Sequence, residues 1–525
     1  MRPEDVGLDH HAWRPHQEET TEWVLRQKGP VFLEMPTGSG KTAIATALGS
    51  KGSVIALMQT KMLQEANYGD AYGWDVLFGR GNYPCAMMGA RVTGDECAFP
   101  QDMHTCPASG HCEYLQMKEM AKGSSRAALN YAYYMSARWP RQQGSTYLVM
   151  DECDTLPETI LEKAGTTVTD KQRMQFDLPA FPSIHSDATV GLGPDPVPLS
   201  MRWLRQAIGT LTRNIGSLSE AAPGSNESHS SLRMQRLLNK LQATFQAMED
   251  EPADWFIRSG AAARSFNTQN QPGFVARPLT ARHHAHLWIA EAEKMNLMMS
   301  ATIGEPATLA AELGIEDYSH MAVPSVWPTE SRYIWAPKDA PAIGMKATEI
   351  DYVRQAEMMA DAIHGCPPEW SGVALMTRKS EAPLVAHRLA KFDLGDRVWV
   401  PPQTSTNEQS RLWEERKRKV PGSIMLSWAH WRGWDGLDEK MLFILKTPYP
   451  STASEYERTR QHYDGKMYFW RTGNTLSQGL GRTRRGRPED YDTDKACNGI
   501  VSILDSNWKR VQKYVPTYLR ESIIS

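Results

Sequence analysis

A glycine-rich loop near the start of the chain has the residue types that hold a nucleoside triphosphate. Residues 36–42 are Pro-Thr-Gly-Ser-Gly-Lys-Thr, after an apolar run at 31–33 and before a helix-compatible stretch at 43–48. In a strand–loop–helix context, glycines let backbone N–H groups close around phosphates at the positive end of a helix. Met35 stands where the general pattern has glycine, and a plain turn after a buried strand is the alternative. The sequence predicts phosphate contacts from Thr37, Gly38, Ser39, Gly40, Lys41 and Thr42.

Four residues have predicted roles in hydrolysis of the bound nucleotide. Lys41 is expected to reach the β- and γ-phosphates, and the Thr42 hydroxyl is expected to bind Mg²⁺. Asp151 and Glu152 follow a second apolar run at 147–150. Hydrolysis needs one carboxylate to hold the metal and another to activate water. We therefore predict Asp151 as a Mg²⁺ ligand and Glu152 as the base, with a solvated acidic loop as the alternative.

Two further segments are expected to complete this site. Ser300-Ala301-Thr302 follows an apolar run, and the basic segment 478–485 lies near the C-terminus. Negative charge that develops on the γ-phosphate is stabilised by arginine supplied across a cleft. Arg482 and Arg485 are three residues apart and would share one helix face, so we predict that both act there. Considered alone, the segment would be interpreted as a basic surface face.

The elements that position these residues are predicted from short apolar runs bounded by turn signals, which are typical of buried parallel strands. These runs are at 31–33, 54–58, 147–150, 297–299, 373–376, 424–426, 441–445 and 500–504. Helical stretches alternate with them, and a proline-rich stretch at 337–341 separates two clusters of runs. The alternation predicts α/β sheets with functional sites at the carboxyl ends of the strands.

Composition narrows the classes of function. The 525 residues are 41% hydrophobic and 23% charged, which is ordinary for a globular protein. The net charge of −3 means that any nucleic-acid binding must come from local patches. No stretch approaches the roughly 18 apolar residues of a membrane span, and the N-terminus has no apolar core for export. We therefore expect no membrane partner and a cytoplasmic protein, or a nuclear one in a eukaryote.

Cysteines in a chain without an export signal favour thiols or metal ligands over disulfides. Four of the seven cysteines are separated by eleven, eight and five residues, namely Cys85, Cys97, Cys106 and Cys112. Structural zinc sites usually use closely spaced cysteine pairs, whereas a [4Fe–4S] cluster also takes four thiolates. The spacing alone leaves zinc, an iron–sulfur cluster and buried thiols open. His104 and His111 lie among the cysteines and keep zinc as an alternative.

In their order along the chain, these motifs resemble those of superfamily 2 helicases, and more specifically the XPD/DinG family of iron–sulfur helicases. The resemblance spans roughly residues 13–510 and rests on Gln17 in Trp-Arg-Pro-His-Gln, the loop at 36–42, Asp-Glu-Cys-Asp at 151–154, Ser-Ala-Thr at 300–302, and 478–485. Residues 79–85 resemble the entry to the family's cluster domain, Asn130-Tyr131 its exit, and residues 431–436 its Gly-x-Asp motif. Asp154 and Arg432 depart from the family, which usually has histidine and often an acidic residue there.

The resemblance implies an α/β fold of two RecA-like parallel-sheet motor domains, with an Fe–S cluster insertion and a helical arch insertion in the first. Helicase domain 1 would comprise 1–80, 126–159 and 281–335, the cluster domain 81–125, the arch 160–280 and helicase domain 2 336–525. It also implies that Gln17 recognises adenine and that Gly433, Asp435 and Gln478 belong to the nucleotide site. The four grouped cysteines would bind a [4Fe–4S] cluster.

The resemblance further implies an ATP- and Mg²⁺-dependent DNA helicase of DNA repair that moves 5′ to 3′ on single-stranded DNA. Its partners would be single-stranded and forked DNA, with RNA–DNA hybrids of R-loops as further substrates, and the motor would be a monomer. Two other classes stay open. One is an ATP-gated nucleic-acid clamp or remodeller that does not separate strands. The other is a redox-responsive binding protein, against which the intact Lys41, Asp151, Glu152 and Arg482 argue.

Overall fold

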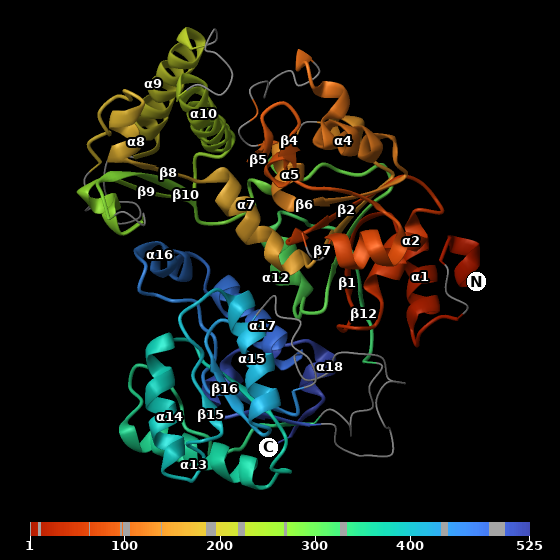
Figure 1. Ribbon diagram of the computed structural model, residues 1–525, viewed down its shortest axis with the longest axis vertical. Coiled ribbons are helices and arrows are strands. Elements are labelled where there is room, and N and C mark those ends of the chain that lie inside the picture. The colour runs from red at the N-terminus through yellow and green to blue at the C-terminus, as the bar shows by residue number, and fades with distance from the viewer. Residues whose placement is uncertain are drawn as a thin grey trace.

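The computed structural model describes residues 2–8, 12–61, 64–94, 97, 105–137, 139–184, 196–218, 226–266, 270–325, 333–431, 439–481 and 499–524. Two seven-stranded sheets organise the chain (Figure 1). We call the parts built on them the first and second α/β domains.

All strands of the first sheet are parallel, in the order β12-β1-β11-β7-β2-β6-β3. The strands are β1 (Gly29–Glu34), β2 (Val54–Met58), β3 (Asp75–Leu77), β6 (Arg126–Asn130), β7 (Tyr147–Asp151), β11 (Met295–Ser300) and β12 (Ser319–Ala322). The central strands β2 and β7 are buried throughout, as expected for a parallel sheet covered by helices on both faces. These helices include α1 (Gln17–Arg26), α2 (Lys41–Leu48), α5 (Tyr131–Ser136), α6 (Trp139–Gln143), α7 (Leu156–Ala164), α11 (Ala285–Trp288) and α12 (Pro306–Glu312).

The second sheet is also parallel, in the order β15-β16-β14-β17-β18-β13-β19. Its strands are β13 (Ile334–Trp335), β14 (Gly372–Leu375), β15 (Val398–Trp399), β16 (Ile424–Ser427), β17 (Met441–Ile444), β18 (Ile500–Ile503) and β19 (Ile523–Ile524). Its helices are α13 (Glu349–His364), α14 (Ala382–Ala390), α15 (Thr406–Lys419), α16 (Glu455–Tyr463), α17 (Gly465–Leu480) and α18 (Thr517–Arg520). Because β13 pairs in this sheet, the second domain begins before residue 336.

Two smaller parts interrupt the first domain. One, which we call the α9–α10 unit, packs two helices on a three-stranded antiparallel sheet. The helices are α9 (Pro196–Ser217) and α10 (Asn226–Asp250), and the strands, in sheet order, are β8 (Thr166–Thr169), β10 (Gly273–Pro278) and β9 (Trp255–Gly260). The short helix α8 (Asp170–Gln175) follows β8. The unit's own core includes Trp203, Leu241 and Phe274. The other carries the grouped cysteines and contains β4 (Pro84–Cys85), β5 (Gly89–Thr93) and α4 (Glu113–Gly123).

The second domain is joined to the rest of the protein by α16 and α17, which lie at the boundary between the lobes (Figure 1). Arg460 of α16 is almost fully buried and donates to Glu158 of α7 at 3.0 Å and to the Leu279 carbonyl oxygen at 3.2 Å. Tyr456 Oη donates to the Pro278 carbonyl oxygen at 2.7 Å. A buried charge that is paired in this way is costly to separate from its partners. The contact therefore holds α16 firmly against the first domain and the α9–α10 unit.

The predicted α/β fold with two parallel sheets is confirmed, and each of the eight apolar runs forms a strand in one of them. Among the helices that the structure describes, none combines the length and the apolar character needed to cross a bilayer.

Candidate nucleotide site

The glycine-rich loop joins the carboxyl end of β1 to the first residue of α2, Lys41. Gly38 and Gly40 have φ angles of +82° and +90°, a left-handed conformation that residues with a Cβ rarely adopt. A Cβ on Gly40 would also lie 1.9 Å from Nε2 of Gln17. The loop thus has the conformation and the position, at a helix N-terminus, that suit phosphate binding.

Two side chains hold the loop in place, one from Arg14 just before α1 and one from Gln17, the first residue of α1. Gln17 Nε2 donates to the carbonyl oxygens of Ser39 at 3.0 Å and Gly40 at 3.3 Å. Arg14 Nη1 donates to the Gly38 carbonyl oxygen at 2.7 Å, and the Arg14 backbone N–H donates to Gln17 Oε1 at 2.8 Å. Gln17 is buried against the loop backbone, and its contact with adenine stays a prediction.

Lys41 and Asp151 are close enough for the charge of the lysine to act on the carboxyl group. Lys41 Nζ donates to the Met35 carbonyl oxygen at 3.3 Å, which is the loop's own backbone. Asp151 ends β7 and is buried, and burial raises the pKa of its carboxyl group to about 6. The negative charge of Glu152 contributes to this rise, and the positive charge of Lys41 opposes it. A buried carboxylate with too little positive charge around it is a fitting ligand for Mg²⁺.

Tyr68 orients the Asp151 carboxylate. It belongs to a π-helical segment, Gln64–Asp70, and its ring is fully buried. Its hydroxyl donates to Asp151 Oδ2 at 3.1 Å, and the Glu152 backbone N–H donates to Asp151 Oδ1 at 3.1 Å. π-Helical turns are rare and often mark functional sites. The sequence around Tyr68 carries no motif that would have indicated this role.

Glu152 lies at one of the contacts between the two α/β domains. It has a φ of +54°, a left-handed conformation that is uncommon for residues other than glycine. Its Oε2 accepts hydrogen bonds from Ser300 Oγ at 3.4 Å and from Gln478 Nε2 at 3.3 Å. Gln478 is on α17 of the second domain and also donates to Thr302 Oγ1 at 2.9 Å. Three segments that are distant in sequence therefore converge on one carboxylate.

Asp154 shares this network. It is buried, and its Oδ1 accepts a hydrogen bond from Ser300 Oγ at 2.8 Å. The aspartate at the position where the resembled family has histidine thus joins the acidic segment directly to Ser300. Ser300 bridges Asp154 and Glu152.

The structure brings together Gln17, the loop residues, Asp151, Glu152 and Gln478. Four predicted site residues lie outside the described residues, namely Gly433, Asp435, Arg482 and Arg485. Sequence reasoning did not single out Arg14, Tyr68 or Glu34, although Arg14 lies within the Trp-Arg-Pro-His-Gln segment.

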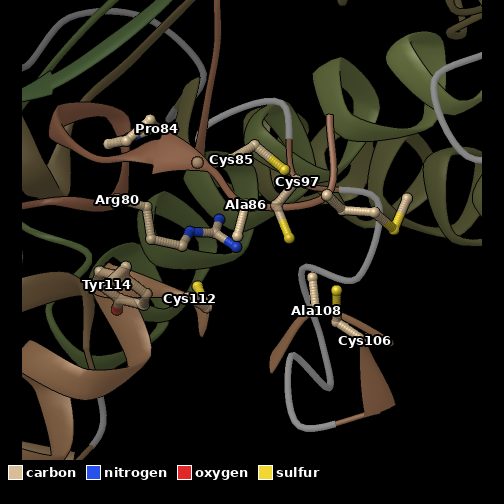
Figure 2. Close-up of a pocket in the computed structure, with 11 residues that line it drawn as sticks. Arg80, Pro84, Cys85, Ala86, Cys97, Cys106, Ala108, Cys112 and Tyr114 are labelled. Atoms are coloured by element: carbon tan, nitrogen blue, oxygen red, sulfur yellow. The ribbon is translucent and has the colours of Figure 1, made fainter. Parts of the chain in front are cut away.

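The four grouped cysteines line one pocket of about 410 Å³, part of it open to solvent. Figure 2 shows Cys106 on a separate stretch of chain across the pocket from Cys85 and Cys97, and it shows the Arg80 side chain extending toward Ala86. Among the described residues, no three His, Cys, Asp or Glu side chains approach closely enough to hold a metal ion. A single zinc ion would need thiolates about 3.8 Å apart, from Zn–S bonds of about 2.3 Å. A [4Fe–4S] cluster takes four thiolates as well, and the four cysteines that line the pocket supply that number of donors.

The molecule thus has two α/β domains with parallel sheets, a glycine-rich loop and an acidic pair in the first, and a glutamine of the second that reaches the acidic pair. No protein-family model and no curated protein sequence matches the chain. Among solved structures, an XPD helicase matches over 96% of this chain and 98% of its own, with a TM-score of 0.57 and 13% identity. The DUF1998 helicase MrfA, solved bound to DNA and AMPPNP, matches 94% of this chain and 48% of its own at a TM-score of 0.37 and 11% identity. The protein therefore has the fold of an XPD helicase.

Proposed function

We propose that the protein is an ATP-driven helicase that acts on DNA. The observation that carries this proposal is the pair of hydrogen bonds from Gln478 of the second domain to Glu152 and Thr302 of the first. A motor that steps along nucleic acid must convert hydrolysis at one domain into movement of the other. A side chain that crosses the domain boundary to the general base is a direct means of doing so.

In the proposed reaction, Lys41 stabilises the negative charge of the β- and γ-phosphates. Thr42 and Asp151 would hold Mg²⁺, which neutralises charge on the phosphate oxygens. Glu152 accepts the proton of the attacking water, and Gln478 holds the Glu152 carboxylate in position. Tyr68 fixes the orientation of Asp151.

Residues outside the described ranges complete the proposal. Arg482 and Arg485 follow α17, which ends at Leu480, and they come four and seven residues after Gln478 in the sequence. We assign them the stabilisation of charge on the γ-phosphate from the second domain. Gly433 and Asp435 are assigned to the same side of the nucleotide site, and Gln17 to adenine.

We further propose movement 5′ to 3′ on single-stranded DNA, as in the XPD/DinG type, with duplexes, forks and R-loops as substrates. Residues 81–125 would hold a structural [4Fe–4S] cluster on Cys85, Cys97, Cys106 and Cys112, and residues 160–280 would form the arch. The pocket that these cysteines share and the separate core of the α9–α10 unit support this division.

A forked DNA duplex with one labelled strand tests the proposal. Strand release and phosphate release are followed in the same reaction with ATP and Mg²⁺, on forks with either a 5′ or a 3′ single-stranded tail. We expect release of the labelled strand that depends on ATP and on the 5′ tail. ATP turnover without strand release would instead support an ATP-gated clamp or remodeller.

A further inference from the structure

Glu34 is a buried carboxylate that the proposed reaction does not use. It is the last residue of β1, directly before the phosphate loop, and its exposed fraction is 2%. Its Oε2 accepts a hydrogen bond from the Gly304 backbone N–H, and the Ile303 N–H also points to the carboxylate. Glu34 thus ties the strand that carries the loop to the turn that follows Ser300-Ala301-Thr302.

The second domain holds this same turn. Trp470 Nε1 of α17 donates to the Ile303 carbonyl oxygen at 2.9 Å, and Tyr518 Oη of α18 donates to the Ala301 carbonyl oxygen at 3.0 Å. Gly304 has a φ of +67°, and a Cβ there would lie 2.0 Å from the Tyr514 carbonyl oxygen. The turn is therefore packed between Glu34 on one side and the C-terminal part of the second domain on the other.

The charge of Glu34 is poorly compensated. Burial raises the pKa of its carboxyl group to about 7, and the Gly304 hydrogen bond, the positive charge of Arg520 and the Ile303 N–H oppose this rise only in part. Arg520, at the end of α18, is close enough to act on Glu34 through its charge. No ion pair within 4.0 Å joins Arg520 to a carboxylate of the described residues.

The Arg520 guanidinium is itself incompletely bonded. Nη2 donates to Thr517 Oγ1 at 2.9 Å, but Nε is buried and has no hydrogen-bond partner. A buried donor without an acceptor and a buried carboxylate without a cation each raise the free energy of this arrangement. Both penalties would fall if the guanidinium moved onto the carboxylate.

We propose that Glu34 and Arg520 form an ion pair across the domain boundary when the two domains close on nucleotide, so that Glu34 is a positioning residue coupling the phosphate loop to the second domain. The inference rests on the proposed function, because it requires nucleotide at the loop. A nucleotide that favours the closed arrangement then binds with a free energy that is more favourable by at most the free energy that the pair contributes to closure.

A double-mutant cycle on the affinity for a non-hydrolysable ATP analogue, AMPPNP with Mg²⁺, tests the pair at pH 8. The variants are Glu34→Gln, which keeps the shape and an acceptor for Gly304, Arg520→Gln, and the two combined. We expect the dissociation constant to rise at least about fivefold in each single variant, and no further in the double variant. Arg520→Lys, which keeps the charge, should recover most of the affinity. Lys513→Gln, which removes an exposed positive charge from the same region, should bind like the unaltered protein.

Effects of Glu34→Gln and Arg520→Gln that simply multiply in the double variant would overturn the proposal, as would unaltered affinity in either single variant. Arg520 is only half-buried, so the comparison of Arg520→Gln, Arg520→Lys and Lys513→Gln decides the matter even if Glu34→Gln does not fold. Absence of AMPPNP binding by the unaltered protein would refute the proposed function itself. Binding by the unaltered protein that the variants reproduce would refute the ion pair alone.

Discussion

Gln478 donates a hydrogen bond to Glu152 across the boundary between the two α/β domains, at 3.3 Å. The same amide nitrogen donates to Thr302 Oγ1 at 2.9 Å, so the position of α17 and the orientation of the general base are linked. Any rotation of the second domain relative to the first must either move Glu152 or break these bonds. The arrangement gives a physical route from domain position to hydrolysis.

Substitution of Gln478 tests this link. Gln478→Ala should lower kcat for ATP by roughly 10–100-fold with a smaller change in KM, since positioning of a general base contributes to the transition state. Glu152→Gln should lower kcat by roughly 10²–10⁴-fold, the range of general-base catalysis. Gln512→Ala, an exposed glutamine of the same domain, is the control and should keep normal turnover. Equal activity of Gln478→Ala and Gln512→Ala would rule out the positioning role.

Glu34 should make the protein less stable as the pH rises through neutrality. Its pKa is about 7 in the folded protein against an ordinary 4.5, so the protonated form is favoured by folding. The protonated carboxyl group therefore adds to the free energy of unfolding. This stabilisation is fully present below about pH 4.5 and is lost as the pH rises through about 7, with a total loss of about 3 kcal/mol. Arg520 is the charged group that acts on it from the second domain. The thermal unfolding midpoint of Glu34→Gln should therefore rise relative to the unaltered protein between pH 5 and pH 7, and stay level above pH 8. A constant difference across this range would show that Glu34 is not buried in this way.

The close approach at Gly304 predicts a specific cost for a methyl group. Gly304→Ala combines a positive φ with a contact of 2.0 Å to the Tyr514 carbonyl oxygen, whereas Gly29 has a φ of +73° and no atom within 4 Å of its Cβ position. Gly29→Ala therefore measures the backbone strain alone. In denaturant unfolding, Gly304→Ala should have a free energy of unfolding roughly 1–3 kcal/mol lower than that of Gly29→Ala, which is the usual cost of overpacking. Similar stability of the two variants would mean that the turn is not held against the second domain.

The cysteine pocket predicts the metal content of the protein. Protein purified without oxygen should contain about four iron atoms and four acid-labile sulfides per chain, and it should be coloured. Cys106→Ser should lose most of this iron, whereas Cys366→Ser, outside the pocket, should retain it. One zinc ion per chain in colourless protein would instead support the zinc alternative.

Much of the fold followed from sequence because its signals are local. Residues 54–58 form β2 as a continuous apolar run, and the loop at 36–42 has its glycines where the backbone needs a positive φ. Short strands such as β13 and β19 were missed, because two residues carry no periodicity and pair only through the tertiary fold. The buried Tyr68 and Glu34 were missed for a related reason. Their roles depend on contacts to Asp151 and Gly304, which lie 83 and 270 residues away in sequence.

Lys41→Ala provides the most direct test of ATP-driven function. ATP hydrolysis by the unaltered protein should rise when single-stranded DNA is added, and Lys41→Ala should reduce this stimulated rate by at least about 100-fold because the charge on the phosphates loses its cation. Binding of single-stranded DNA by the same variant should be nearly unchanged, which separates loss of chemistry from loss of the fold. Normal DNA-stimulated turnover by Lys41→Ala would contradict the assignment of this loop as the site of hydrolysis.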